Sequence, residues 1–472
     1  MKRIILISCI LTALSFTSCS NNNISDQGAD TNIELTSDTT DALAEENQSD
    51  APVKNELTII TSCENDTYSL LAGWLGTEPD QLVKRIESGE LEWINVVEVD
   101  ASDNNSFEYY KYLADNKADL IISNSGMIKA FTDNTDLSMD LNDLMITSED
   151  KENAFDYTWQ LACDTEEKTR AVTLFSNPGV FVYNSEIVSE YLGITSPDKM
   201  QEAVSDWEKF RNTASALAEA SDGKTALADS TEGIWQAYCT DRNTPSVEYI
   251  EEDIFTYITP ITSEFNEYFC RDLTALWETG GVSHTSKNTS QWISNGAEGA
   301  TAGYFLSFEE ADKVLDSISD KSVTDQQNKW EVCSGPASFY NDDVMLIVCT
   351  GTDNTEECRE IIRSVLSDNE NAYKLAENSK RFVNNKTAMK KVLSEHNTES
   401  LISSKAIKNK ENAFRCYYSN AERIHLNYKF SAYDTSYNKI FLDTVKQYAL
   451  EQHYSIEDTM SVFFKNAESE FN

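Results

Sequence analysis

Short apolar runs rich in β-branched residues alternate with helical patterns along this chain, and this alternation most restricts its possible folds. The runs ELTIITS (56–62), WINVVEVD (93–100) and ADLIIS (118–123) have the length and composition of buried strands. A helical pattern lies between the last two, around residues 107–113. Strands that alternate with helices form parallel sheets whose faces are both covered. The sequence therefore predicts an α/β fold.

Polar residues follow two of these predicted strands. Ser62 ends the first run, and Asn124 and Ser125 follow the third. In open α/β sheets, ligands bind beyond the carboxyl ends of the strands. We therefore expect these three residues, together with Asp66 after the first strand, to line a binding cleft. Gly126 also fits a plain turn.

The rest of the chain continues the same pattern. Two strand-like runs flank Asn177-Pro178-Gly179, and an amphipathic helix follows from Ser185. Further strands are predicted within 301–308, 330–339 and 343–351, and further helices within 205–221, 354–376 and 436–471. The part of the chain from about residue 56 to residue 472 is longer than 400 residues. A single core stops growing beyond roughly 250–300 residues, so this part must contain at least two domains or lobes.

A short apolar run that ends at a cysteine distinguishes the N-terminal segment. Lys2 and Arg3 precede the apolar residues 4–16, which as a helix would rise only about 20 Å, too little for a bilayer of roughly 30 Å. This is the pattern of a secretory signal peptide. The small residues before Cys19 resemble a bacterial lipoprotein signal, which implies removal of residues 1–18 and lipidation of Cys19. The polar tract that follows, up to residue 55, predicts a disordered linker. An ordinary signal peptide with an incidental cysteine is the alternative.

The charge balance restricts the partners. The chain has 80 acidic and 38 basic residues, a net charge of −42, which argues against nucleic acid and against electrostatic docking on anionic lipid. Eight cysteines follow Cys19 at wide spacings without a C-x-x-C pair, so disulfides and buried free thiols both stay open. The sequence also contains no G-x-S-x-G or H-E-x-x-H motif. We expect no catalytic residues, cofactor or metal site.

Five stretches, taken in order, resemble extracellular solute-binding proteins of family 1, the sugar-type class that serves ABC importers. They are the lipoprotein start with its spacer, ADLIISNSG, VFVYNSEIVSEYLGI followed by SDWEKF, WISNGAEGATAGYF, and YSIEDTMSVFFKNAESEF. Together they span nearly the whole mature chain. TSCENDTYS, after the first strand, lacks the tryptophan often found there, and the segment 240–290 matches no part of the family pattern.

This resemblance implies a two-lobed, periplasmic-binding-protein-like fold of type II, with an interlobe cleft and extra C-terminal helices. Lobe I would comprise residues 56–172 and 289–338, and lobe II residues 173–288 and 339–472. Hinges would lie near 163–171, 284–289 and 339–343. The lobes would close around a solute by hinge motion, and the permease subunits of an ABC transporter would recognise the closed form. The anchor at Cys19 would hold the protein on the extracytoplasmic face of the cell membrane.

The expected solute is an oligosaccharide. Sugars present apolar C–H faces and hydroxyl rims, so their sites combine aromatic rings with carboxylate and amide groups. Five aromatic residues near expected strand ends or loops are candidates for contact with the ligand: Trp235, Tyr238, Tyr304, Phe305 and Tyr340. Core packing is the competing interpretation for each of them.

Other functions stay open at this point. A surface-anchored carbohydrate-active enzyme would use a pair of carboxylates, and acidic residues are too numerous here for such a pair to be informative. A receptor for an amino acid, peptide or polyamine is a second alternative. An anionic solute would require Arg170, Arg242 or Arg271 at the cleft, and a cationic one would favour the acidic residues 251–253. A sensor or adhesin subunit with the same fold is a third.

Overall fold

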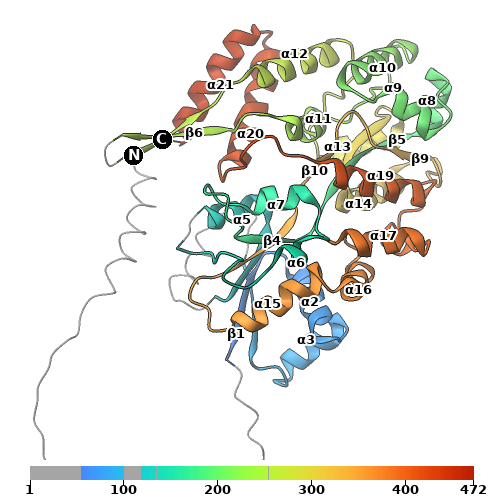
Figure 1. Ribbon diagram of the computed structural model, residues 1–472. Coiled ribbons are helices and arrows are strands. Elements are labelled where there is room, and N and C mark those ends of the chain that lie inside the picture. The colour runs from blue at the N-terminus through green and yellow to red at the C-terminus, as the bar shows by residue number, and fades with distance from the viewer. Residues whose placement is uncertain (1–54, 100–117, 134–135, 253–254, 472) are drawn as a thin grey trace, which may run out of the picture.

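The computed structural model describes residues 55–99, 118–133, 136–252 and 255–471, and in these ranges strands alternate with helices (Figure 1). The expected signal peptide, lipidation site Cys19 and helix at 107–113 lie outside the described residues, as does the linker up to residue 54. Within the described ranges, no helix is long and apolar enough to span a bilayer.

A five-stranded sheet, which we call sheet I, forms the centre of one lobe. Its strand order is β2 (Ile94–Glu98), β1 (Leu57–Thr61), β3 (Leu120–Asn124), β11 (Val344–Val348) and β4 (Ala171–Phe175). β1 pairs in parallel with β2 and β3, as predicted, whereas β11 runs antiparallel to β3 and β4. All residues of β1, β4 and β11 are buried, which is why these strands are continuous apolar runs.

A second, antiparallel sheet, sheet II, forms the centre of the other lobe. β5 (Pro178–Asn184) is its middle strand and pairs with β8 (Gly303–Ser307) on one side. On the other side it pairs with β10 (Phe339–Tyr340) and then with β9 (Trp330–Cys333). A separate hairpin of β6 (Val247–Glu252) and β7 (Phe255–Pro260) extends from this lobe toward the left of Figure 1.

Helices surround both sheets. Those packed around sheet I are α2 (Glu64–Leu75), α3 (Pro79–Glu87), α5 (Ser125–Thr132), α6 (Ser148–Lys151), α7 (Asp156–Ala162), α15 (Thr355–Leu366), α16 (Asn369–Ser379) and α17 (Lys386–Ser394). Those grouped with sheet II are α8 (Ser185–Leu192), α9 (Pro197–Ala203), α10 (Trp207–Ala220), α11 (Thr231–Tyr238), α12 (Glu264–Glu278), α13 (Ser290–Glu298), α14 (Phe308–Lys321), α18 (Thr398–Leu401), α19 (Lys410–Arg423), α20 (Asp434–Thr444) and α21 (Ile456–Phe471). Short 3₁₀ and π segments follow α11 and α20, at Cys239–Asp241 and Val445–Glu451.

The side chains of β5 alternate between two hydrophobic cores. Val180 and Val182 belong to a cluster that continues into the lobe around sheet I. Phe181 and Tyr183 point to the other face, where they share a cluster with Phe441 of α20. α20 and α21 bury their apolar sides in this same cluster, where Phe441 packs on Trp235 and Phe269, which explains why the C-terminal helices are amphipathic. The expected C-terminal helices therefore belong to the lobe of sheet II.

The chain passes from sheet I to sheet II at residues 176–177, between β4 and β5, and returns at 341–343, between β10 and β11. It crosses to the lobe of sheet II once more at 395–397, between α17 and α18. The second passage coincides with the crossover expected near 339–343. The first lies beyond its expected range of 163–171, and the expected hinge at 284–289 lies inside the lobe of sheet II. Figure 1 shows the lobe of sheet I in the lower half of the view and the lobe of sheet II in the upper half.

Two of the expected lobe boundaries are wrong. Residues 289–338 belong with sheet II, because β8 and β9 pair with β5. Residues 344–394, which were expected in lobe II, belong with sheet I, because β11 inserts between β3 and β4. From here on, lobe I means sheet I with its helices and lobe II means sheet II with its helices.

The eight cysteines of the described residues are all free thiols, and four of them are buried. Burial raises the pKa of Cys270 to about 11 and that of Cys358 to about 12, so these thiols stay protonated near neutral pH. They behave as small apolar side chains in the two cores.

Candidate ligand-binding cleft

Two cavities lie between the lobes, and Asp342 in the second passage lines both of them. The larger one has a volume of about 650 Å³. Lobe I lines it with the carboxyl ends of β1, β2 and β3, the start of α2 and residues 379–381, and lobe II with the first turns of α14. The smaller one has a volume of about 210 Å³ and lies between the start of α5 in lobe I and helices α11 and α20 in lobe II. Together we call them the cleft.

An arginine bridges the lobes in the larger cavity. Arg381 Nη1 lies 3.4 Å from Asp66 Oδ2 of lobe I and 3.0 Å from Glu309 Oε1 of lobe II. Lys313 Nζ also lies 3.0 Å from Glu309 Oε1. Burial raises the pKa of Asp66, and Arg381 opposes this effect by stabilising the carboxylate. The two lobes are therefore joined across the cleft by charge.

The passages at 176–177 and 341–343 are hydrogen-bonded to each other through Asn177. Its backbone N–H donates to Asp343 Oδ1 at 2.8 Å, and its amide donates to the carbonyl oxygen of Asn341 at 2.5 Å. Its own carbonyl accepts from Asn341 N–H at 3.0 Å, and its side-chain oxygen accepts from Glu309 N–H at 3.0 Å. Asp343 is fully buried, and burial raises its pKa to about 7. A change in the angle between the lobes must therefore act on this set of bonds.

The smaller cavity has aromatic walls and unsatisfied polar atoms. Tyr340, Tyr428 and Phe430 line it together with Trp235. Trp235 Nε1, Gln236 Nε2 and Asn438 Oδ1 have no hydrogen-bond partner among the described residues. A buried polar group without a partner is destabilising by about 1–3 kcal/mol, so a ligand or water that bonds to these atoms is favoured.

The structure brings most of the predicted site residues to this cleft. Ser62, Asp66 and Asn124 line the larger cavity, and Ser125, Trp235 and Tyr340 line the smaller one. Asn124 also caps α5, since its side chain accepts from Met127 N–H at 3.0 Å. The carboxyl ends of parallel strands meet at one sheet edge, which is why residues far apart in sequence lie together here.

Three predicted site residues lie elsewhere. Tyr304 and Phe305 are fully buried within β8, and the Tyr304 hydroxyl donates to the carbonyl oxygen of Trp292 at 2.9 Å. Tyr238 is 8% exposed, and its ring centroid lies 4.9 Å from that of Trp207. None of the three lines either cavity. For these residues the core interpretation holds, because both faces of β8 are covered.

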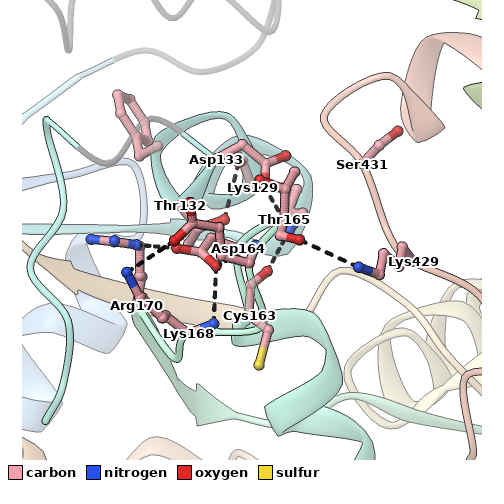
Figure 2. A network of polar contacts seen from close by, with 12 residues as sticks. Lys129, Thr132, Asp133, Cys163, Asp164, Thr165, Lys168, Arg170, Lys429 and Ser431 are labelled. Atoms are coloured by element: carbon pink, nitrogen blue, oxygen red, sulfur yellow. Dashed lines mark hydrogen bonds and ion pairs between the residues drawn. The ribbon is translucent and has the colours of Figure 1, made fainter. Parts of the chain in front are cut away.

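The arginines considered for an anionic solute are engaged elsewhere. Arg170 Nε lies 2.5 Å from Asp164 Oδ2, and Arg170 Nη1 donates to the carbonyl oxygen of Ser138 at 2.7 Å. Figure 2 shows this pair within a polar network that also includes Lys129. In the same network Lys429 Nζ donates to the carbonyl oxygen of Thr165 at 3.3 Å, which fastens the segment before α20 to lobe I (Figure 2).

The other two arginines do not line the cleft either. Arg242 is 1% exposed and its Nη2 lies 2.5 Å from Asp434 Oδ2. Arg271 lies over the ring of Tyr268, on α12. The acidic residues 251–253, considered for a cationic solute, have side chains outside the described part of the structure.

Sequence reasoning missed the residues that lobe II and the long loops contribute: Glu309, Asp312, Lys313, Asp342, Lys380, Arg381, Tyr428 and Asp434. Most carry no sequence signal, because charged residues at helix starts and in loops are usually solvated. Asp342 is the exception. It follows the aromatic pair of β10 directly, inside the range where a hinge was expected.

The cleft contains carboxylates and aromatic rings, and no histidine lines either cavity as described. Among the described residues, no group of three or more His, Cys, Asp or Glu side chains is placed to hold a metal ion. The arrangement offers hydrogen-bond donors, acceptors and flat apolar surfaces. These are the groups that bind a small polar molecule reversibly.

No family model matches the sequence, and no curated protein is similar enough in sequence to match it. Solved structures do match. A protein described as extracellular solute-binding protein family 1 has 16% sequence identity and a TM-score of 0.71, over 89% of this chain and 100% of that one. The sugar-binding protein MalE from Xanthomonas citri has 9% identity and a TM-score of 0.63, over 88% and 97%. The galacto-N-biose/lacto-N-biose I-binding protein of an ABC transporter from Bifidobacterium longum has 11% identity and a TM-score of 0.59, over 89% and 96%.

These matches define a two-lobed α/β binding fold with a cleft between the lobes, and they confirm the predicted fold class. More particularly, the chain has the fold of family 1 extracellular solute-binding proteins, along nearly all of its described length.

Proposed function

We propose that this protein is a solute-binding receptor of an ABC importer, which captures a small solute, an oligosaccharide, between its lobes and releases it chemically unaltered. The observation that carries this proposal is the cleft itself. Both lobes line each cavity, and the polypeptide passes between the lobes at its floor. A solute bound there would contact both lobes at once, so it would stabilise the closed form relative to the open form.

The contacts across the cleft suggest how closure works. The pairs of Arg381 with Asp66 and Glu309 link the lobes across the larger cavity, beside the packing of Phe308 on Phe382, and such partly exposed pairs contribute about 1 kcal/mol or less each. A solute that bonds to both lobes would add to this small contribution. The bonds of Asn177 to Asn341 and Asp343 would keep the two passages together as the lobes rotate.

The cellular setting is proposed from the sequence. Lipidation at Cys19 would anchor the receptor on the extracytoplasmic face of the cell membrane, and the segment up to residue 55 would let the lobes reach the permease subunits. Tethering raises the effective concentration of receptor beside its transporter. Nucleic acid is not a partner in this proposal, because the chain is strongly acidic.

A ligand screen tests the proposal. The protein without its first 18 residues would be heated with neutral oligosaccharides, amino acids and polyamines, and a bound solute should raise the melting temperature by mass action. Isothermal titration would then give Kd, and chromatography of the recovered solute would show whether it is intact. Cleavage of the solute would support the enzyme alternative, and no shift with any solute would refute the receptor.

A pair of matched variants tests the site. Gln236→Leu keeps the side-chain size and removes an amide that lines the smaller cavity, whose Nε2 has no hydrogen-bond partner among the described residues and whose Oε1 accepts from Lys287 Nζ. Gln291→Leu makes the same change on the exposed surface of α13. We expect the first to weaken binding at least tenfold and the second to leave it unchanged. Equal affinities for both variants would place the site elsewhere.

A further inference from the structure

Three polar side-chain atoms of residues that line the smaller cavity have no hydrogen-bond partner among the described residues. Trp235 is 3% exposed, and its indole N–H has no hydrogen-bond partner among the described residues. The Gln236 amide nitrogen and the Asn438 side-chain oxygen on the same cavity wall also have none. A ligand unit that both donates and accepts hydrogen bonds would satisfy all three atoms.

The charge of the cavity wall has one sign. Among the described residues, its charged lining side chains are Glu232, Asp342 and Asp434, with no lysine or arginine. Glu232 is neutralised by Lys446 Nζ at 3.0 Å and Asp434 by Arg242. Asp342 has no hydrogen bond or ion pair within the described part of the chain.

The surroundings of Asp342 make its isolation more pronounced. Asp342 is exposed to solvent in the cleft; partial desolvation and the neighbouring carboxylates Glu310 and Glu309 raise its pKa, and Lys287 lowers it. Lys287 is already engaged, because it pairs with Glu310 at 2.8 Å and donates to the Gln236 side-chain oxygen. Glu309 is likewise paired with Arg381 and Lys313, so among these three carboxylates Asp342 is the one without an ion-pair partner in the described part of the chain.

Position 342 is also strained. Asp342 has a φ of 48°, in the left-handed region that residues other than glycine rarely adopt. Strain of this kind is destabilising by about 1–3 kcal/mol and persists at ligand sites. It holds the carboxylate at the junction of the two cavities, where a solute lying in the cleft would pass.

We propose that the solute carries an ammonium group that pairs with the Asp342 carboxylate, while its hydroxyls bond to Trp235, Gln236 and Asn438. This inference rests on the proposed function and specifies its solute as an amino sugar or an oligosaccharide that contains one. A cation at this point would give Asp342 the ion-pair partner that Glu309 and Glu310 already have. A charge-assisted bond is roughly twice as strong as a neutral one, so the amine should discriminate strongly.

The test compares two oligomers that differ in charge. Chitosan oligosaccharides carry free amines, and chitin oligosaccharides of the same length carry neutral acetamides. The wild-type protein should bind the amine at least tenfold more tightly at pH 6.0, where the chitosan amines are largely protonated, by isothermal titration, and added salt should reduce this preference. Asp342→Asn should lower the preference to less than threefold. Asparagine tolerates the left-handed backbone, so this variant should melt near the wild-type temperature.

Asp443→Asn serves as the control, because Asp443 is an exposed carboxylate on α20 and its loss should leave the preference unchanged. Equal binding of both oligomers, or tighter binding of neutral sugars, would overturn the ammonium assignment and leave the proposed receptor standing. Binding of polyamines alone, lost in Asp342→Asn, would support the pairing at Asp342 and overturn the oligosaccharide. If no solute of the screen binds, the proposed function and this inference both fail.

Discussion

Replacing Asp343 by asparagine should remove a buried charge from the passage between the lobes. Asp343 is 0% exposed, and its Oδ1 accepts from Asn177 N–H at 2.8 Å. The groups that act on it are Tyr157, Asp342 and Arg381, together with that backbone N–H. Asparagine keeps the acceptor oxygen in place, so Asp343→Asn changes the charge and leaves the bond between the passages intact.

The expected magnitude follows from the pKa. Burial raises the pKa of Asp343 from 3.8 to about 7, a difference of about 3 units or about 4 kcal/mol. Between these two pH values the folded protein binds a proton that the unfolded chain has lost. The contribution of Asp343 to stability is therefore fully present below about pH 4 and is lost as the pH rises to about 7. The asparagine side chain does not titrate, so the variant does not lose this stability as the pH rises.

Urea unfolding at pH 4, 6 and 8, followed by tryptophan fluorescence, would measure the effect. The free energy of unfolding of Asp343→Asn relative to the wild type should increase by about 4 kcal/mol from pH 4 to pH 8. The same change at Asp443, whose side chain is 65% exposed, should give a difference that does not vary with pH. A pH-independent difference for Asp343→Asn would refute the argument that this carboxyl is buried without a compensating charge.

Three further predictions concern the cleft and the cores. Trp235→Ala should lower the free energy of unfolding by about 3–5 kcal/mol, because its ring packs 4.6 Å from Phe269 and 4.7 Å from Phe441; a loss below 1 kcal/mol in urea unfolding would contradict this core role. Arg381→Met should open the ligand-free protein, seen as a larger radius of gyration in X-ray scattering, and should change stability by about 1 kcal/mol or less; an unchanged radius would show that the bridge does not hold the lobes. Dithiothreitol should leave the melting temperature unchanged, because the eight described cysteines are free; a lower melting temperature would reveal a disulfide.

The sequence predicts the strands and helices well where burial alone decides them. β1, β3, β4 and β11 are continuous apolar runs because helices cover both faces of sheet I, and each was visible as such a run. The pairing of β11 was not visible. It leaves sheet II, crosses at 341–343 and inserts antiparallel between β3 and β4. A short apolar strand has the same pattern in either sheet, which is why the lobe boundaries were wrong.

The same distinction applies to the candidate site, where some residues could be predicted from the sequence and others could not. Ser62 and Asn124 were found because they follow parallel strands, whose carboxyl ends meet at one edge. Tyr304 and Phe305 were chosen for a similar reason, but they lie within β8, and the cleft begins only after its end, at Phe308 and Glu309. In a strand buried on both faces, an aromatic residue can reach only a core. Arg381 could not be found at all, because its role depends on Asp66 and Glu309 being brought near it.

Two destabilising features lie side by side in the second passage: the left-handed backbone of Asp342 and the buried carboxyl of Asp343. Glycine at 342 would relieve the first and asparagine at 343 the second, so neither feature serves stability. Both lie where the lobes meet and where the two cavities join. Departures from local rules are expected at functional sites, where strain and isolated charge are compensated by a ligand or by motion. The position of these two residues therefore argues, independently of any similarity to other proteins, that the cleft is where this molecule acts.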